Sequence, residues 1–400
     1  MANKLLTSDK IVTRALAVLH EVLTVPPNVN RQYSDEFSDT GAKSGDSIRI
    51  RKPTRFVAAE GAEAVFQDVD EDYATLTIAK QFNVPVEFTS KELTLSLDDF
   101  ETVVLRPAMA ALASRIDQYA FEVLNTGCGA VVLGSGANEA IKWSDLVKAG
   151  AYLDQNATPR DGNRSVLINP LTQANVLDET KGLFNAPSIA EQYREGVIGR
   201  TGGFLFTSAS RAPVITLPAT LTGTVSGSYT AGASTINLTG LAKSTQYPAG
   251  SVFTVANVYD VHPETKESLG RLHAFVVREK FTTDATNGDA SGVSIFPVYA
   301  TTGKQNVTAL PSSGAAVTFV GTAGKSYRQT FAFHRDAFAF ATVDMVLPAG
   351  ASRKVMDGVS MRYASDWDGE KDRHIKRFDV LCGIAPTCPE LCVKLLEPNS

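Results

Sequence analysis

The stretch that most constrains this chain is a segment with an apolar stripe, which runs from Leu97 to Asn125. Its apolar side chains recur at steps of three and four, which places them on one face of a helix. Such a helix would be about 40 Å long at 1.5 Å per residue, the width of a whole domain. Ser96 can cap its start and Gly127 follows its end, whereas Pro107 predicts a kink or a second start. The predicted core face consists of Phe100, Val104, Ala108, Leu112, Ile116, Tyr119 and Val123.

Composition is that of an ordinary globular protein with two or three domains. The 400 residues are 44% hydrophobic and 20% charged, with a net charge of −5. This balance argues against a dedicated nucleic-acid binder, which usually carries a basic surplus on one face. No run approaches the roughly 18 apolar residues that cross a bilayer, so we expect no membrane association. The cysteines, which we expect to be reduced thiols, are Cys128, Cys382, Cys388 and Cys392.

Changes of pattern divide the chain into segments. The middle one is rich in Gly, Thr, Ser, Val and Ala, with short alternating runs between turn signals, which predicts a small all-β barrel or sandwich. Mixed α/β pattern precedes it and resumes after it, so we interpret it as an insertion. The predicted segments are an N-terminal arm (1–45, with a helix over roughly 9–24), an extended two-stranded loop (46–88), the long helix (89–128), an α/β region (129–218), the β insertion (219–325) and a mixed return (326–400).

The segment 46–88 predicts a long ribbon with basic legs and an acidic loop. Ile48 and Ile50 alternate with Arg49 and Arg51, and the return strand is YATLTIAKQF. An isolated ribbon of this length is marginal in water, so we expect it to rest on a partner. The basic legs could meet DNA phosphates or the acidic loop of another copy, and the opposite signs within one ribbon favour the second alternative. The predicted inter-subunit contacts are Arg49, Arg51 and Arg55 on the legs, and Glu60, Glu63, Asp68 and Asp70 on the loop.

A search for catalytic chemistry finds no constellation. The chain has no GxGxxG after a strand, no GxxxxGK[ST], no HExxH and no GxSxG. Its histidines are scattered, and none has the spacing of a metal ligand. The best candidate for a cation is the run of alternate acids from Asp366 to Asp372, which lacks the EF-hand layout and by default is a solvated turn. We therefore expect no catalytic residue, cofactor or metal.

The order of these parts resembles the HK97-like fold of the major capsid proteins of tailed phages. The segment AEQYREGVIGRTGGFLFTSASRAPVITL is similar to the stretch that leads into the inserted domain of P22-like coat proteins. The β-rich insertion lies where that family carries its extra barrel. VSMRYASDWDGEKDRHIKRFDVLCGI is similar to the late strands of the family. The resemblance implies an α+β fold with a spine helix, peripheral and axial domains and an inserted all-β barrel.

The resemblance also implies a function. The expected protein is the major capsid protein of a tailed double-stranded DNA bacteriophage, which self-assembles into the pentamers and hexamers of an icosahedral shell. Implied partners are other copies of the chain, a scaffolding protein, a portal, and DNA that is enclosed without sequence-specific binding. The implied location is the virion capsid after assembly in the host cytoplasm. The inserted domain is expected to help the subunit to fold and to brace contacts between capsomers.

Three alternatives remain open from the sequence. An encapsulin-like compartment would keep the fold and load a protein cargo instead of a genome. An enzyme, such as a hydrolase with a β accessory domain, would need a cluster of titratable groups that the sequence does not reveal. A virion decoration or tail protein would not explain the long helix and the ribbon together.

Overall fold

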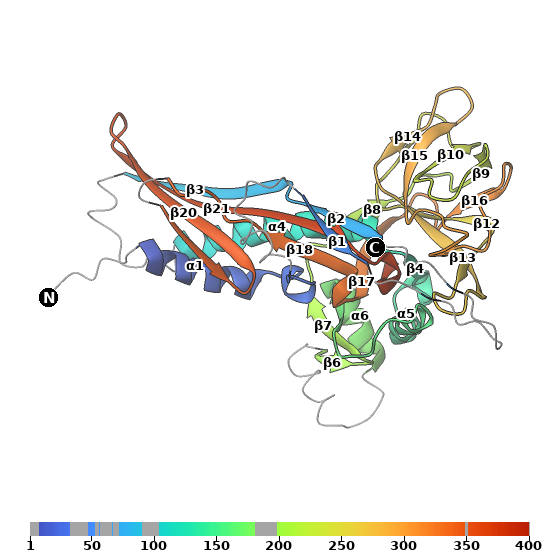
Figure 1. Ribbon diagram of the computed structural model, residues 1–400, viewed down its shortest axis with the longest axis horizontal. Coiled ribbons are helices and arrows are strands. Elements are labelled where there is room, and N and C mark those ends of the chain that lie inside the picture. The colour runs from blue at the N-terminus through green and yellow to red at the C-terminus, as the bar shows by residue number, and fades with distance from the viewer. Residues whose placement is uncertain are drawn as a thin grey trace. The chain divides into compact units, whose positions relative to one another are not determined.

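The computed structural model describes residues 8–32, 47–52, 56, 66, 72–89, 104–180, 198–348 and 351–399 (Figure 1). The chain is a mixed α+β protein with two compact units. The first comprises Met1–Ile50, Ala74–Ala120 and Phe338–Ala385, and the second comprises Arg51–Tyr73, Phe121–Ala337 and Pro386–Ser400.

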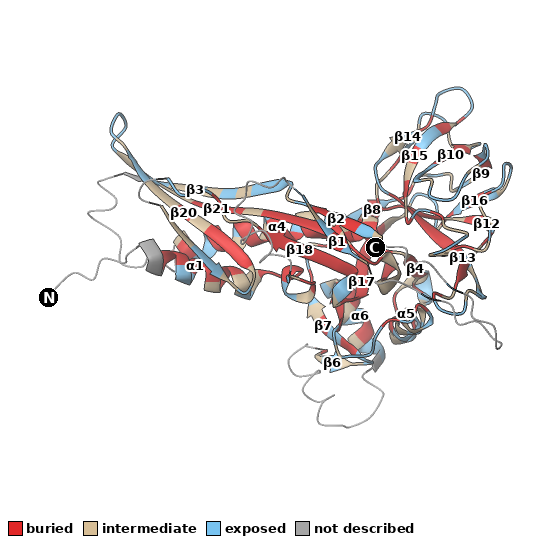
Figure 2. Ribbon diagram, in the orientation of Figure 1, coloured by how far each residue is buried: buried red, intermediate tan, exposed pale blue. Residues whose placement is uncertain are grey.

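The first unit is built on an antiparallel sheet. Its strands are, in spatial order, β18 (Phe338–Thr342), β21 (Arg373–Pro386), β20 (Val359–Asp368) and β19 (Ser352–Met356), with β3 (Lys80–Thr89) also paired to β21. Register places Tyr363 opposite Phe378, and both side chains are buried. Because alternate residues of a strand share a face, this side of the sheet is the core. Figure 2 shows β18 buried and the turn between β20 and β21 exposed.

The N-terminal helix α1 (Ser8–Val22) packs on β19 and β20 of this sheet. Val12, Ala15, Leu16 and Leu19 are buried, at the spacing of one helix face. The predicted helix of the arm is therefore present, and it contributes to the core of its own chain. A short 3-10 turn, η1 (Pro26–Asn28), follows it.

The long helix of the sequence corresponds to α4 (Arg106–Gly127). Pro107 lies in the first turn of α4, directly after the π-helical residues 104 and 105, so the described residues place a change of helical geometry at the proline. The helix ends at Gly127, as predicted. The predicted beginning, from Ser96 to Phe100, lies outside the described residues.

The predicted return strand of the ribbon is divided between two sheets. β1 (Ser47–Arg51) pairs with β2 (Tyr73–Thr77), but β3 begins at Lys80 and pairs with β21. Phe82, Val84 and Val86 are half-buried and alternate with exposed residues, so β3 gains apolar contact by joining the core face of the larger sheet. The run 73–82 is therefore divided between two strands of different sheets. The return strand of the ribbon ends at Thr77, which is earlier than predicted.

The second unit contains a mixed sheet with helices on one face. Leu146, Ala149 and Leu153 of α5 (Trp143–Gln155) pack with Val166 of β5 and Leu395 of β22. The strand order is β4 (Ala130–Leu133), β22 (Cys392–Pro398), β17 (Ser326–His334), β5 (Arg164–Ile168), β7 (Phe204–Ser208) and β6 (Arg200–Thr201), with β8 (Val214–Thr216) paired to β17. The other helices in the described part of this unit are α6 (Pro170–Thr180) and the 3-10 turns η3 (Ala137–Glu139), η4 (Arg335–Ala337) and η5 (Pro389–Leu391).

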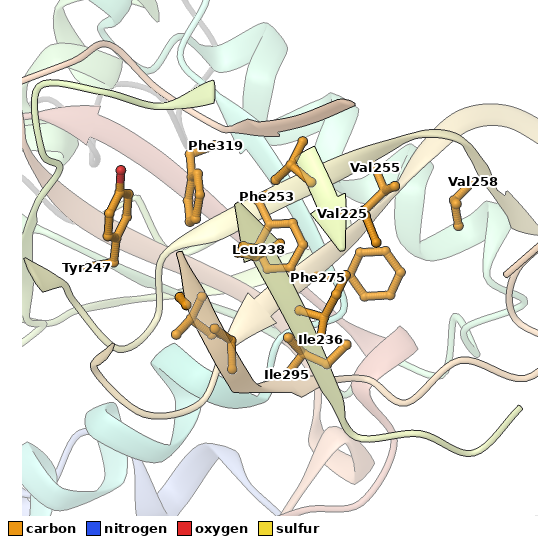
Figure 3. Close-up of a cluster of buried hydrophobic side chains, with 14 of the residues drawn as sticks. Val225, Ile236, Leu238, Tyr247, Phe253, Val255, Val258, Phe275, Ile295 and Phe319 are labelled. Atoms are coloured by element: carbon orange, nitrogen blue, oxygen red, sulfur yellow. The ribbon is translucent and has the colours of Figure 1, made fainter. Parts of the chain in front are cut away.

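The inserted segment is a closed barrel, in agreement with the sequence. Its interior is filled by large side chains such as Phe253, Phe275 and Phe319, whose rings lie against one another (Figure 3). The barrel strands are, in order, β10 (Thr235–Thr239), β15 (Ala290–Phe296), β13 (Ser268–Val277), β12 (Val252–Val261), β16 (Ala316–Phe319) and β9 (Thr222–Ser226), and β11 (Gln246–Tyr247) pairs with β14 (Phe281–Thr282).

The structure corrects the expectation for the cysteines. Cys128 and Cys392 are joined by a disulfide, although 264 residues separate them in the chain. The end of α4 and the start of β22 bring their Cα atoms to 5.0 Å. Cys382 and Cys388 are buried and are not joined by a disulfide, and burial raises the pKa of the Cys382 thiol to about 12.

Candidate assembly surface

The base of the ribbon has the alternation that the sequence predicts. Ile50 and Leu76 are buried with Ala339 and Ala341 of β18, while Arg49 points the other way. Arg51, at the end of β1, is also exposed. The apolar side therefore anchors β1 and β2 in the core, and the side chain of Arg49 is exposed on the other side.

Lys52 and Asp72 are a charged pair that the sequence analysis missed, and they join the two legs of the ribbon where the loop begins and ends. The amide of Lys52 donates to the Asp72 carbonyl at 2.9 Å, and its ammonium lies 3.0 Å from the Asp72 carboxylate. Lys304 lies 3.9 Å from the same carboxylate. Burial by itself would raise the pKa of Asp72, but the hydrogen bond and the charge of Lys52 outweigh it and hold that pKa below its ordinary value. Lys52 therefore forms its ion pair with Asp72 of the same chain.

The loop between Lys52 and Asp72 contains most of the residues that are predicted to contact another copy. Arg55, Glu60, Glu63, Asp68 and Asp70 lie outside the described residues, so their roles stay predictions.

Two phenylalanines of the same loop are described, and sequence reasoning overlooked them. Phe56 is 53% exposed and Phe66 is 95% exposed. Singly exposed apolar side chains are common on protein surfaces, so these two exposures do not by themselves assign a contact. The signal that could have found them is an aromatic residue within an otherwise charged and small-residue loop.

The hairpin of β20 and β21 carries a second exposed region. Its turn, at 369–372, is the hairpin tip that the charged run SDWDGEKD predicts. Asp366 and Asp368 accept hydrogen bonds from nearby backbone amides, as expected for a solvated turn. Within the ranges that the structure describes, no cluster of acids, histidines or cysteines is arranged to hold a metal. Trp367 is 57% exposed beside this turn.

A network of charges stiffens the solvent face of the same hairpin. Arg362 donates to the Asp379 carboxylate from Nε at 3.2 Å and Nη2 at 2.8 Å, and Arg377 donates from Nε at 2.7 Å. The Asp379 side chain is fully buried beneath these two arginines. Two guanidinium groups therefore share one buried carboxylate.

Replacing Asp379 by alanine should lower the free energy of unfolding by about 1–3 kcal/mol, because both arginines lose a charge-assisted acceptor but can turn to solvent. Thermal unfolding measures the loss, and Asp366→Ala at the exposed turn is the matched control. Equal stability of Asp379→Ala and the control would contradict this assignment.

Comparison with known proteins identifies the family. The family model described as "P22 coat protein - gene protein 5" matches residues 28–396. No curated protein matches the chain. None of the described helices is long and apolar enough to span a membrane.

Solved structures give the fold. A chain of "Mycobacterium phage Che8" matches with 12% identity and a TM-score of 0.50, over 93% of this chain and 90% of that one. A chain of the "Capsid of Ralstonia phage GP4" matches with 8% identity and a TM-score of 0.46, over 90% and 85%. The "virus-like particle from Pyrococcus furiosus" gives 11% identity and a TM-score of 0.43, over 97% and 98%. The fold is the HK97-like fold of phage capsid proteins with an inserted barrel, and the chain belongs to the P22 coat protein family.

Proposed function

We propose that this coat protein is the major capsid protein of a tailed double-stranded DNA bacteriophage. Copies of the chain assemble as pentamers and hexamers into an icosahedral shell that encloses the genome. The observation that carries the proposal is the family match, which extends over residues 28–396 and so includes the ribbon, α4 and the barrel together. The protein acts in the virion capsid and is assembled in the host cytoplasm.

The chemistry of the ribbon supports a role in contacts between copies. Its base is fixed in the core by Ile50 and Leu76, so the basic side chain of Arg49 is presented outward from a rigid support. The acidic loop supplies the opposite charge. Identical copies that each carry both charges can complement one another around a ring, as a heterologous interface requires. Many such contacts, each weak, give a stable shell that can still correct errors during assembly.

The proposed partners are other copies of the chain, a scaffolding protein and a portal. DNA is enclosed without sequence-specific contacts, in keeping with the net charge of −5. The experiment is expression with the neighbouring phage genes, followed by density-gradient isolation of particles and analysis of their nuclease-protected contents. Double-stranded DNA inside closed particles is the expected result. Particles filled with one protein cargo instead would overturn the proposal in favour of an encapsulin-like compartment.

Reversing the charge of Glu60, Glu63 and Asp70 together should reduce the yield of closed particles at least tenfold. The reason is that each reversed loop repels the basic legs of the neighbouring copy, and the effect is repeated at every contact of the shell. Sedimentation separates particles from free subunits and measures the yield.

The matched control reverses three exposed carboxylates outside both the ribbon and the barrel, Glu21, Glu122 and Asp178. It makes the same change in net charge, and we expect nearly normal particle yield. Normal particles from the ribbon variant, or an equal loss in both variants, would count against the ribbon as the contact.

A further inference from the structure

The disulfide between Cys128 and Cys392 joins two distant parts of the second unit. Cys128 follows the last residue of α4, and Cys392 is the first residue of β22. The two are separated by 264 residues in the chain, and the stretch between them contains the barrel and most strands of the mixed sheet. Both side chains are fully buried. Because thiols stay reduced in most cytoplasms, the proposed place of assembly limits when this bond can form.

Contacts other than the bond already hold the two cysteines together. The amide of Gly129 donates to the carbonyl of Pro389 at 2.9 Å, and Ala130 pairs with Val393 in the parallel ladder of β4 and β22. A Cβ on Gly129 would lie 2.6 Å from the Pro389 carbonyl oxygen, so a glycine permits this close approach. The Cα atoms of the two cysteines lie 5.0 Å apart, within the range of about 4.4–6.8 Å that a disulfide spans. The fold itself therefore brings the two sulfurs together.

The reduced form is compatible with the same fold. The Cys128 sulfur lies 3.2 Å from the carbonyl of Leu124. That carbonyl is in the last turn of α4, where carbonyls lack an intrahelical partner, so a Cys128 thiol donates a weak hydrogen bond to it. Cys392 pairs in register with Phe333 of β17, and a buried thiol at that position behaves as a small apolar side chain. The chain can therefore fold with two thiols and gain the bond afterwards.

We propose that the bond between Cys128 and Cys392 is a redox-controlled staple, which forms after the chain has folded and when the particle leaves the reducing cytoplasm. This inference rests on the proposed function, because assembly inside a cell followed by release supplies the change of redox conditions. In the reduced chain, β22 is held by hydrogen bonds and packing alone. In the oxidised chain, β22 is also tied covalently to the end of α4.

The oxidant is a low-molecular-weight disulfide, of which oxidised glutathione is the example used below. A thiolate of the pair attacks this disulfide, forms a mixed disulfide and releases one small thiol. The second cysteine then attacks the mixed disulfide, which forms the protein bond and releases the other small thiol. The two cysteines lose two electrons and two protons, and the small disulfide gains them.

Burial controls the rate of this exchange. Neither sulfur is exposed, so a small disulfide reaches the pair only when the end of α4 or the start of β22 opens locally. The same enclosure shields the finished bond from small reductants, because exchange needs access to a sulfur atom. The bond therefore forms slowly and is then retained.

The staple should raise the resistance of the chain to heat. A cross-link between distant residues removes conformations from the unfolded chain, and the gain grows with the length of the closed loop. We expect the oxidised chain to unfold at a temperature at least about 5 °C above that of the reduced chain.

The test begins with the full-length chain expressed in a reducing bacterial cytoplasm and alkylated under denaturing conditions at lysis. Mass spectrometry of digests should find Cys128 and Cys392 alkylated. Purified folded protein that is then treated with oxidised glutathione should form the bond between them and show the rise in unfolding temperature. Protein oxidised in urea should instead give mixed pairings, in which Cys388 with Cys392 prevails because a short loop closes at lower entropic cost. Particles collected after host lysis in air should carry the bond between Cys128 and Cys392.

Serine variants locate the effect. Cys392→Ser should show no rise in unfolding temperature on treatment with oxidised glutathione. Cys382→Ser is the matched control, because it removes another buried thiol and should keep the full rise. If Cys392→Ser does not fold, the reduced and oxidised wild-type chains decide the question without a substitution.

Four results would overturn the staple. They are a complete bond in protein alkylated at lysis, thiols that persist in the folded chain with oxidant or in released particles, an equal yield of the pairing from the urea-unfolded chain, and equal unfolding temperatures for both redox forms. Except for the released particles, each sample is measured on subunits. A failure of the staple is therefore distinct from a failure of the proposed function, which would appear as an absence of closed particles.

Discussion

Replacing Glu397 by alanine is expected to lower the free energy of unfolding by about 3–5 kcal/mol. The Glu397 side chain is almost completely buried and accepts hydrogen bonds from Arg328 Nε at 2.9 Å, Asn175 Nδ2 at 2.7 Å and the Ile141 amide at 3.3 Å. The Thr172 hydroxyl also donates to it. Without the carboxylate, the buried guanidinium of Arg328 has lost its counter-ion. Urea unfolding measures the loss as a lower midpoint with an unchanged slope.

The double variant Glu397→Ala/Arg328→Met separates the ion pair from the rest of this network. It should be less destabilised than the sum of the two single variants, because no charge is then left buried. Glu122→Ala, on an exposed position of α4, is the control and should change stability by less than about 0.5 kcal/mol. A Glu397→Ala protein as stable as this control would refute the assignment.

Replacing Asp117 by alanine should lower the free energy of unfolding by about 2–4 kcal/mol. The carboxylate is buried on α4 and accepts the amide of Thr24 at 3.1 and 3.0 Å and the amide of Val25 at 3.0 Å. These amides follow the end of α1, so their loss leaves buried donors without an acceptor and loosens the attachment of the N-terminal segment. Chemical denaturation gives the loss, and hydrogen exchange at residues 23–28 should accelerate.

Asp117→Asn tests whether the charge matters as well as the shape. The amide keeps one acceptor oxygen, so we expect about half of the loss seen with alanine. Gln118→Ala, at the exposed neighbouring position, is the matched control. If Asp117→Asn and Asp117→Ala both behaved like Gln118→Ala, the carboxylate would have no role in holding the N-terminal segment.

Periodicity predicted the elements whose burial depends on local spacing. Ala108, Leu112 and Ile116 of α4 are buried as the apolar stripe predicts. Ile50 is buried and Arg49 exposed, as the alternation in β1 predicts. The barrel was recognisable because short alternating runs between turns have few other ways to bury their apolar side chains.

The other features of the structure depend on contacts between distant parts of the chain. The spacing of apolar and polar residues along the sequence does not indicate such contacts. β3 pairs with β21, where its apolar face becomes half-buried, so the predicted return strand is divided at a point that no turn signal marks. Lys394 and Glu397 lie in a C-terminal strand where charges suggest a solvated end, yet both are buried. Asp117 accepts hydrogen bonds from amides about 90 residues away in the chain, which the spacing of residues within α4 does not indicate.

The function was predicted from the order of the parts along the chain, whereas the fold elements were predicted from the local spacing of residues. No residue of the chain carries a chemical signature, and the resemblance of the whole order of parts indicated a coat protein, which the family match confirms. The ribbon contacts remain predictions, since Glu60 and its acidic neighbours lie outside the described residues.

The central claim, that this chain forms the wall of an icosahedral shell, is tested most directly by electron microscopy of the purified protein. The protein should be imaged after expression alone and after expression with the neighbouring phage genes, over a wide range of concentration. Closed shells of uniform size with fivefold and sixfold clusters of subunits in the co-expressed sample are the predicted result. Monomers without closed particles in both samples, at every concentration, would contradict it.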